Sequence, residues 1–271
     1  MPLAAWSSEE GAVLLLDKPL TWTSFDVVRK VKNTLHIKKI GHAGTLDPLA
    51  TGLLILCTGK KTKQIDLIQA QEKEYTGTFR LGQTTPSFDL ETAVDAEQPF
   101  AHLTEAEIRA ATTQFMGLIE QTPPLFSAVK INGERAYEVA RRGGAAEIKS
   151  KQVTIREFEI TRIALPAVDF RVTCSKGTYI RSLARDLGAA LGVGAHLTKL
   201  VRTRIGEYAL ADALTMEQIE ALRPPRPEGG EARPPRQQRP PRPERRAGLE
   251  FYNAHSANPA AGTEPNPTQP E

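Results

Sequence analysis

Cysteine is scarce in this sequence, and its spacing excludes the common metal sites and disulfide frameworks. Only two cysteines, Cys57 and Cys174, occur among the 271 residues, and each lies in an apolar stretch. Structural zinc sites need closely spaced cysteine and histidine ligands, which two distant cysteines cannot supply. We therefore expect two small, buried side chains in a reducing compartment and no bound metal.

Long hydrophobic runs and the motifs of nucleotide-dependent enzymes are also absent. The N-terminal segment MPLAAWSSEEGAVLLLD has no basic region followed by a long apolar run, so it predicts neither a signal peptide nor a membrane span. No G-x-G-x-x-G follows a predicted strand, residues 52–62 do not have P-loop spacing, and neither H-E-x-x-H nor G-x-S-x-G occurs. We expect a cytoplasmic protein with no membrane partner and no nucleotide, nicotinamide or metal cofactor.

A change in composition divides the chain into a body, 8–222, and a tail, 223–271. Overall, 40% of the residues are hydrophobic and 25% are charged, which is typical of a globular protein. The tail from Pro224 onward holds 12 of the 20 prolines, and eight arginines face three glutamates between Arg223 and Arg246. Such a composition cannot bury enough apolar surface to offset chain entropy, so we expect a disordered tail. Its basic part either tethers RNA through charge or has no partner.

Hydrophobic periodicity in the body predicts a mixed order of strands and helices. Strands are expected at 12–16, 53–57, 74–81, 128–131 and 170–174, with further strand inside 147–162. Helices are expected at 24–35, 60–68, 104–115 and 179–191, with a short last helix after Thr215. Because this order is not a steady βαβ alternation, we predict an α+β fold with a large mixed, mostly antiparallel sheet flanked by helices.

Residues that can cap a helix indicate where these helices begin. The expected N-caps are Ser24, Thr104 with Glu107, Thr178, and Thr215 with Gln218. In the first helix, the spacing places Phe25, Val28, Val31 and Leu35 on one face.

One segment, GHAGTLDPLATG at 41–52, has the features of an active-site loop. It lies between a predicted helix and a buried strand, and it contains three glycines. Glycine allows close backbone approach, and Pro48 restricts the preceding Asp47 to an extended conformation. A carboxylate on a tight loop beside a rigid strand suits catalysis. An aspartate before proline can equally be a turn residue that caps its own backbone.

Four segments together resemble the TruB type of pseudouridine synthases, which modify the T-loop of tRNA. They are LDKP at 16–19, the loop at 41–52, KEY at 73–75, and CSKGTYIRSL at 174–183 with GAHL and LVR after it. The resemblance extends from about Val13 to Leu222. It implies that residues 8–222 form a pseudouridine-synthase-like catalytic domain. That domain would isomerise the uridine at conventional tRNA position 55 by flipping the base, without a cofactor.

The same resemblance assigns roles to individual residues. It makes Asp47 the catalytic carboxylate, Tyr75 an active-site tyrosine that can stack on the uracil or transfer a proton, and Arg181 the partner of the aspartate. A cation in the first turn of a helix opposes the helix dipole, so we expect Asp47 to offset it through an ion pair in the free enzyme. His42, Tyr179 and Leu200, together with Tyr75, match substrate-binding positions.

Without the resemblance, each of these residues has an ordinary structural explanation. The tyrosines and the leucine could be core residues, and His42 and Arg181 could be loop and surface residues. Lys18 and Pro19 match a family segment that supports the active-site loop, so we expect structural roles for them.

The implied partner is the T-arm of tRNA, bound by a monomer that recognises the folded shape of the RNA. Candidate phosphate contacts are Lys60, Lys61, Lys63, Arg141 and Arg142, each of which could equally be a solvated surface charge. Many TruB-type enzymes carry a C-terminal RNA-binding domain of the PUA class, whereas here the tail follows Leu222 directly. We expect the basic segment to replace that domain in part.

Three alternatives remain at this stage. The protein could be a tRNA-folding chaperone in addition to, or instead of, an isomerase. It could be a guide-RNA-dependent subunit of a larger particle, or it could perform the same chemistry on a different RNA.

Overall fold

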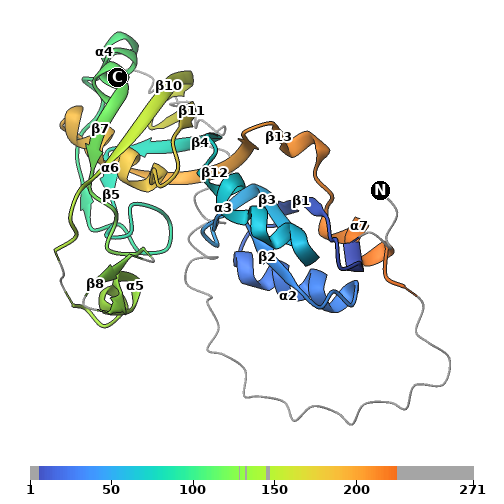
Figure 1. The fold of residues 1–271 in the computed structure, drawn as a ribbon. Helices are drawn as coiled ribbons and strands as arrows, with labels where there is room; N and C mark the ends of the chain where they lie inside the picture. Colours follow the sequence, from blue (N-terminus) through green and yellow to red (C-terminus); the bar gives the residue numbers. More distant parts are fainter. Residues whose placement is uncertain (1–5, 128, 132, 145–146, 225–271) are drawn as a thin grey trace, which may run out of the picture.

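A mixed nine-stranded sheet organises the protein in the computed structural model, which describes residues 6–127, 129–131, 133–144 and 147–224 (Figure 1). The order along the sheet is β1 (Val13–Lys18), β3 (Ala50–Thr58), β12 (Ala195–Ile205), β4 (Lys73–Leu81), β11 (Ala167–Cys174), β10 (Lys151–Ala164) and β7 (Gly117–Gln121). β2 (Ile40–His42) pairs with β3, and β13 (Tyr208–Ala209) pairs with β12. Among these pairs only β12 and β3 are parallel, which confirms the predicted mixed, mostly antiparallel sheet.

Helices flank this sheet, as expected. They are α2 (Ser24–Thr34), α3 (Ile65–Ala70), α4 (Glu105–Ala111), α5 (Ala136–Arg141), α6 (Ile180–Ala190) and α7 (Met216–Ala221). In Figure 1, α2 and α7 lie with β1 and β3, whereas α4 and α6 lie with β7 and β10 at the other end. Two small hairpins are β5 (Gln83–Thr84) with β6 (Ala96–Glu97), and β8 (Lys130–Ile131) with β9 (Glu134–Arg135). No helix in the described part of the chain is long and apolar enough to cross a membrane.

Strand β12 joins two densely packed regions of the protein. On one side, α6 packs with β4, β10, β11 and β12 around a stack of Phe79 and Phe170, whose ring centroids are 3.9 Å apart. On the other side, α2 and α7 pack against β1 and β3. Because β12 lies between β3 and β4, its side chains are placed at the junction of the two regions.

The start of α2 differs from the prediction by one residue. Thr23, not Ser24, is the N-cap, and it forms a capping box with Asp26. The Ser24 hydroxyl instead bonds to the backbone of Leu46. Val28, Val31 and Leu35 are buried as predicted, whereas Phe25, in the first turn, is 68% exposed and does not share their buried face.

Other helix boundaries were predicted with mixed success. The capping boxes at Thr104 and Thr215 are confirmed. For α6 the N-cap is Tyr179 rather than Thr178, whose hydroxyl donates to the Ser175 carbonyl within the preceding turn. The predicted helix at 60–68 begins as a 3-10 helix, Gly59–Gln64, and continues as α3. Strand β7 was not predicted.

Both cysteines are buried and unbridged, as expected. Burial raises the pKa of the Cys57 and Cys174 thiols to about 11, so both stay protonated at neutral pH. The expected disordered tail lies outside the described residues, apart from Arg223 and Pro224.

Candidate active site

The loop that carries Asp47 connects β2 to β3 and is held from one side by Lys18. This lysine is fully buried at the end of β1. Its ammonium donates to the carbonyls of Pro19 (2.9 Å), Trp22 (2.7 Å) and Pro48 (3.3 Å). Burial lowers the Lys18 pKa to about 8, although the nearby Asp47 charge acts in the opposite direction. The expected role of Lys18 in supporting the loop is therefore confirmed.

Arg202, on β12, holds the same loop from the other side. Its guanidinium is 1% exposed and donates to the carbonyls of Leu53 (2.8 Å), Gly44 (3.1 Å) and Thr45 (3.4 Å). Gly52 passes close by with φ +96°, and a Cβ there would lie 2.4 Å from the Arg202 carbonyl oxygen. Only glycine fits this position without a backbone shift. Lys18 and Arg202 thus hold the loop on both sides of Asp47, independently of the contacts of Asp47 itself.

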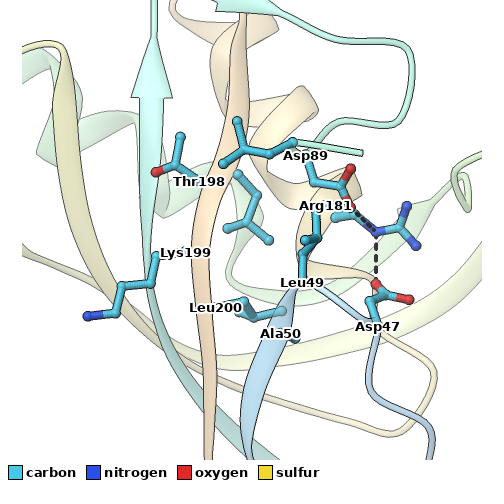
Figure 2. A pocket seen from close by; sticks show the side chains of 10 residues that line it. Asp47, Leu49, Ala50, Asp89, Arg181, Thr198, Lys199 and Leu200 are labelled. Atoms are coloured by element: carbon cyan, nitrogen blue, oxygen red, sulfur yellow. Dashed lines mark ion pairs between the residues drawn. The ribbon is translucent and has the colours of Figure 1, made fainter. Parts of the chain in front are cut away.

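Asp47 forms an ion pair with Arg181, which confirms the expected pairing (Figure 2). The distance from Asp47 Oδ2 to Arg181 Nε is 2.9 Å, and the two side chains are 41% and 4% exposed. The rest of the guanidinium donates to the carbonyls of Ser87 (3.2 Å) and Phe126 (2.9 Å). A buried cation therefore orients a carboxylate that remains accessible from solvent.

Asp89 is a second carboxylate on Arg181, and sequence reasoning missed it. Its Oδ2 lies 3.5 Å from Arg181 Nε, and Figure 2 shows the guanidinium between the two acids. Its Oδ1 accepts hydrogen bonds from the Ser87 hydroxyl (2.6 Å) and the Glu91 N–H (2.9 Å). Burial raises the Asp89 pKa to about 6, with Arg181 and then Ser87 acting in the opposite direction. No local pattern marks Asp89, because it meets Arg181 only in the folded chain.

A pocket opens beside the ion pair (Figure 2). It is lined by Asp47, Leu49, Ala50, Asp89, Leu90, Arg181, Leu197, Thr198, Lys199 and Leu200. The register of β12 against β4 shifts between Leu197 and Lys199, and such bulges redirect side chains beside functional sites. The space measures about 270 Å³ including its open mouth, and its enclosed part is large enough for about one water molecule.

The remaining predicted residues differ in whether they reach this pocket. Leu200 lines the pocket, whereas Tyr75, Tyr179 and His42 do not. Tyr75 is buried on β4 opposite Arg202 in the strand register. Burial raises the pKa of both tyrosines, and the Asp47 charge adds to this, so both phenols are protonated at neutral pH.

His42 is half-buried at the end of β2, immediately before the loop. Burial and then the Arg202 charge lower the pKa of its imidazole, which favours the neutral ring. The ring therefore offers a flat, uncharged surface next to the loop that carries Asp47.

Several predicted phosphate contacts already have acidic partners on the protein. Lys60 lies 2.6 Å from Glu10, and Arg141 lies 2.6 Å from Glu91. Arg142 pairs with Glu134. These exposed pairs are weak and can exchange for a phosphate, but the arrangement gives no specific support to the prediction.

Comparison with known proteins gives a consistent set of relatives. Residues 32–180 match the family described as TruB family pseudouridylate synthase (N terminal domain), and residues 181–224 match the tRNA pseudouridylate synthase B C-terminal domain. The tRNA pseudouridine synthase B of Flavobacterium johnsoniae is 58% identical over 78% of this chain and 95% of its own length. The protein of that name from Phocaeicola vulgatus is 54% identical over 77% of this chain and 92% of its own.

Two longer chains of known structure contain a region with the same fold. A chain in a Cbf5-Nop10-Gar1 complex matches with a TM-score of 0.62 and 32% identity, over 80% of this chain and 55% of its own. A chain in an H/ACA RNP bound to a substrate RNA containing 2'-deoxyuridine matches with a TM-score of 0.57 and 29% identity, over 76% of this chain and 51% of its own. The present chain thus spans about half the length of these two chains.

Proposed function

The chain belongs to the TruB family of pseudouridylate synthases, and from this membership we propose that it isomerises the T-loop uridine of tRNA, at conventional position 55, to pseudouridine with Asp47 as catalytic carboxylate. The curated relatives named tRNA pseudouridine synthase B support the activity, because the chain covers 92% to 95% of their length. One observation carries the residue assignment: Asp47 is a partly exposed carboxylate held at a pocket by the buried Arg181.

The reaction requires a group that can act at the sugar or the base while the uracil is detached. The C1′–N1 bond breaks, the base turns within the site, C5 bonds to C1′, and the C5 proton leaves as N1 takes one up. A carboxylate can act as a nucleophile in such a step, or it can stabilise the sugar while its C1′ is electron-poor. The ion pair with Arg181 and the braced loop fix the position of Asp47 before substrate arrives. No electron or group is transferred to another molecule, so the reaction as written needs no cofactor.

The residues around Asp47 supply surfaces for the flipped base. We propose that Tyr75 stacks on the uracil or passes a proton as a neutral phenol, and that Leu200 and Tyr179 also contact the base. We propose that His42, at the start of the loop, packs against the base that has left its stack. Unstacking a nucleotide costs a few kcal/mol, which these contacts must offset.

Binding of RNA is part of the same proposal. One structural relative is described as bound to a substrate RNA, which supports RNA as the ligand class here. We propose the T-arm as the recognised element, a monomer as the active form, and residues 8–222 as the catalytic domain. The arginine-rich segment at 223–246 would add a charge-based tether, a proposal that rests on its composition alone.

Mapping of the product along an unmodified tRNA transcript tests this function. The full chain should form pseudouridine at one T-loop position, and Asp47→Ala should form none. Asp66→Asn serves as a matched control, because it removes an exposed carboxylate on α3. Pseudouridine at other positions only, or a fully active Asp47→Ala protein, would contradict the proposal.

A further inference from the structure

The buried lysines and arginines of the described residues use their donors on the protein itself. Arg181 binds two carboxylates and two carbonyls. Arg202 and Lys18 each donate to three carbonyls. Lys73 donates to the carbonyls of Gln69 and Gln71. These four side chains hold the fold, so the negative charge of a bound nucleotide must be met by other cations.

Lys151 is a cation beside Tyr179 that has no acidic partner among the described residues. Its ammonium lies 4.5 Å from the centroid of the Tyr179 ring, and the side chain is half-buried. Among the described residues, no carboxylate lies within ion-pair distance of it. Lys199 does line the pocket, but Figure 2 shows its ammonium directed away from Asp47 and Arg181. Lys151 therefore has free donors beside a residue that lies two positions from Arg181.

The surroundings fix Lys151 and Tyr179 relative to each other. Lys151 pairs with Gln121 in the β10–β7 register. The buried Gln121 side chain accepts a hydrogen bond from the Tyr179 N–H (2.8 Å) and donates one to the Tyr179 carbonyl (3.1 Å). Gly177 makes room for the lysine, since a Cβ there would lie 3.3 Å from the ammonium. The position of the cation is thus built into the strand pair and the turn before α6.

We propose that Lys151 binds a backbone phosphate of the RNA next to the nucleotide whose base enters the Asp47 pocket, a role that rests on the proposed function. A flipped base carries its own sugar and flanking phosphates to the edge of the site, so an anion must settle close to the base pocket. An ammonium held over an aromatic ring, without a carboxylate partner, meets that anion as a point charge. Neutralising one phosphate releases counterions and makes binding depend on salt.

The test measures binding of an unmodified tRNA transcript by the full-length protein over a series of KCl concentrations. Lys151→Met keeps an apolar stem of similar length over Tyr179 but removes the charge, and Lys151→Arg restores the charge. Arg156→Gln is the matched control, because it removes a positive charge from the same strand at a position 72% exposed and paired with Glu72. Thermal unfolding of each variant reports on folding.

The slope of log Kd against log salt should become shallower by about 0.7 to 0.9 in Lys151→Met, the contribution of one phosphate contact. Lys151→Arg should keep the wild-type slope, as should Arg156→Gln. An unchanged slope in Lys151→Met would overturn the inference, and so would a lower turnover rate at saturating tRNA with unchanged binding, which would make Lys151 only a support for Tyr179. Failure of the wild-type protein to form pseudouridine would instead refute the proposed function.

Discussion

Titration of Asp89 should make the stability of this protein depend on pH in a specific direction. Its side chain is 7% exposed, and burial raises its pKa from 3.8 to about 6. The unfolded chain releases this proton at the lower value, so the folded state binds more protons between the two values. The contribution of Asp89 to the free energy of unfolding therefore falls as the pH rises from 3.8 to about 6, and it is constant above that range.

The size of the effect follows from the shift. About two pKa units correspond to about 3 kcal/mol. Asp89→Asn has a neutral side chain of nearly the same shape, so it lacks this titration. The free energy of unfolding of the variant, minus that of the wild type, should rise by about 3 kcal/mol between about pH 3 and about pH 7. The change with pH is the test, because the absolute difference also contains altered hydrogen bonds to Ser87 and Glu91.

Urea unfolding at closely spaced pH values measures this difference. Thr92→Val serves as the control, because Thr92 accepts a hydrogen bond from the Ser87 N–H in the same loop but does not titrate. The control difference should be the same at every pH. A difference for Asp89→Asn that stays constant, or falls as the pH rises, would refute the account of Asp89 as a carboxylate destabilised by burial.

Two pairs of substitutions test the backbone and packing around the loop, again by urea unfolding. Gly52→Ala should lower the free energy of unfolding by several kcal/mol, because φ is +96° and a Cβ would contact the Arg202 backbone. Gly192→Ala should lower it by only about 1 kcal/mol, because φ is +72° but the space around a Cβ is open. Equal losses of stability in the two variants would contradict the close approach of Arg202 to Gly52. Phe25→Ala should change stability by less than about 0.5 kcal/mol, whereas Leu35→Ala should cost about 2–5 kcal/mol. A large loss in the Phe25 variant would mean that this ring is packed rather than exposed.

The buried strands and the loop that carries Asp47 were predictable because their signals are local. The apolar run at 53–57 and the alternation at 74–81 correspond to the interior of β3 and to β4. The glycines and Pro48 marked the loop that precedes β3. The start of α2 was wrong by one residue because Thr23 and Ser24 are both good N-caps, and the choice depends on the Ser24 contact with Leu46.

Contacts between distant parts of the chain explain what was missed. Neither the Asp89–Arg181 pair nor the bonds from Arg202 to Gly44 and Thr45 have a sequence spacing that would reveal them. Arg181 was placed beside Asp47 by family resemblance, and the helix dipole only made a balancing acid plausible. The pairing of β7 with β10 likewise depends on the neighbouring strand and not on a signal within the short segment itself.

Single-turnover pseudouridine formation by Asp47→Asn tests the central claim most directly, because it separates the catalytic carboxylate from RNA binding. With the protein in excess over an unmodified tRNA transcript, Asp47→Asn should bind the RNA but form no detectable pseudouridine, while Asp66→Asn should match the wild-type rate. A tRNA chaperone activity, if present, should survive the change. Formation of pseudouridine by Asp47→Asn at the wild-type rate would contradict the assignment of Asp47 as the residue that carries the reaction.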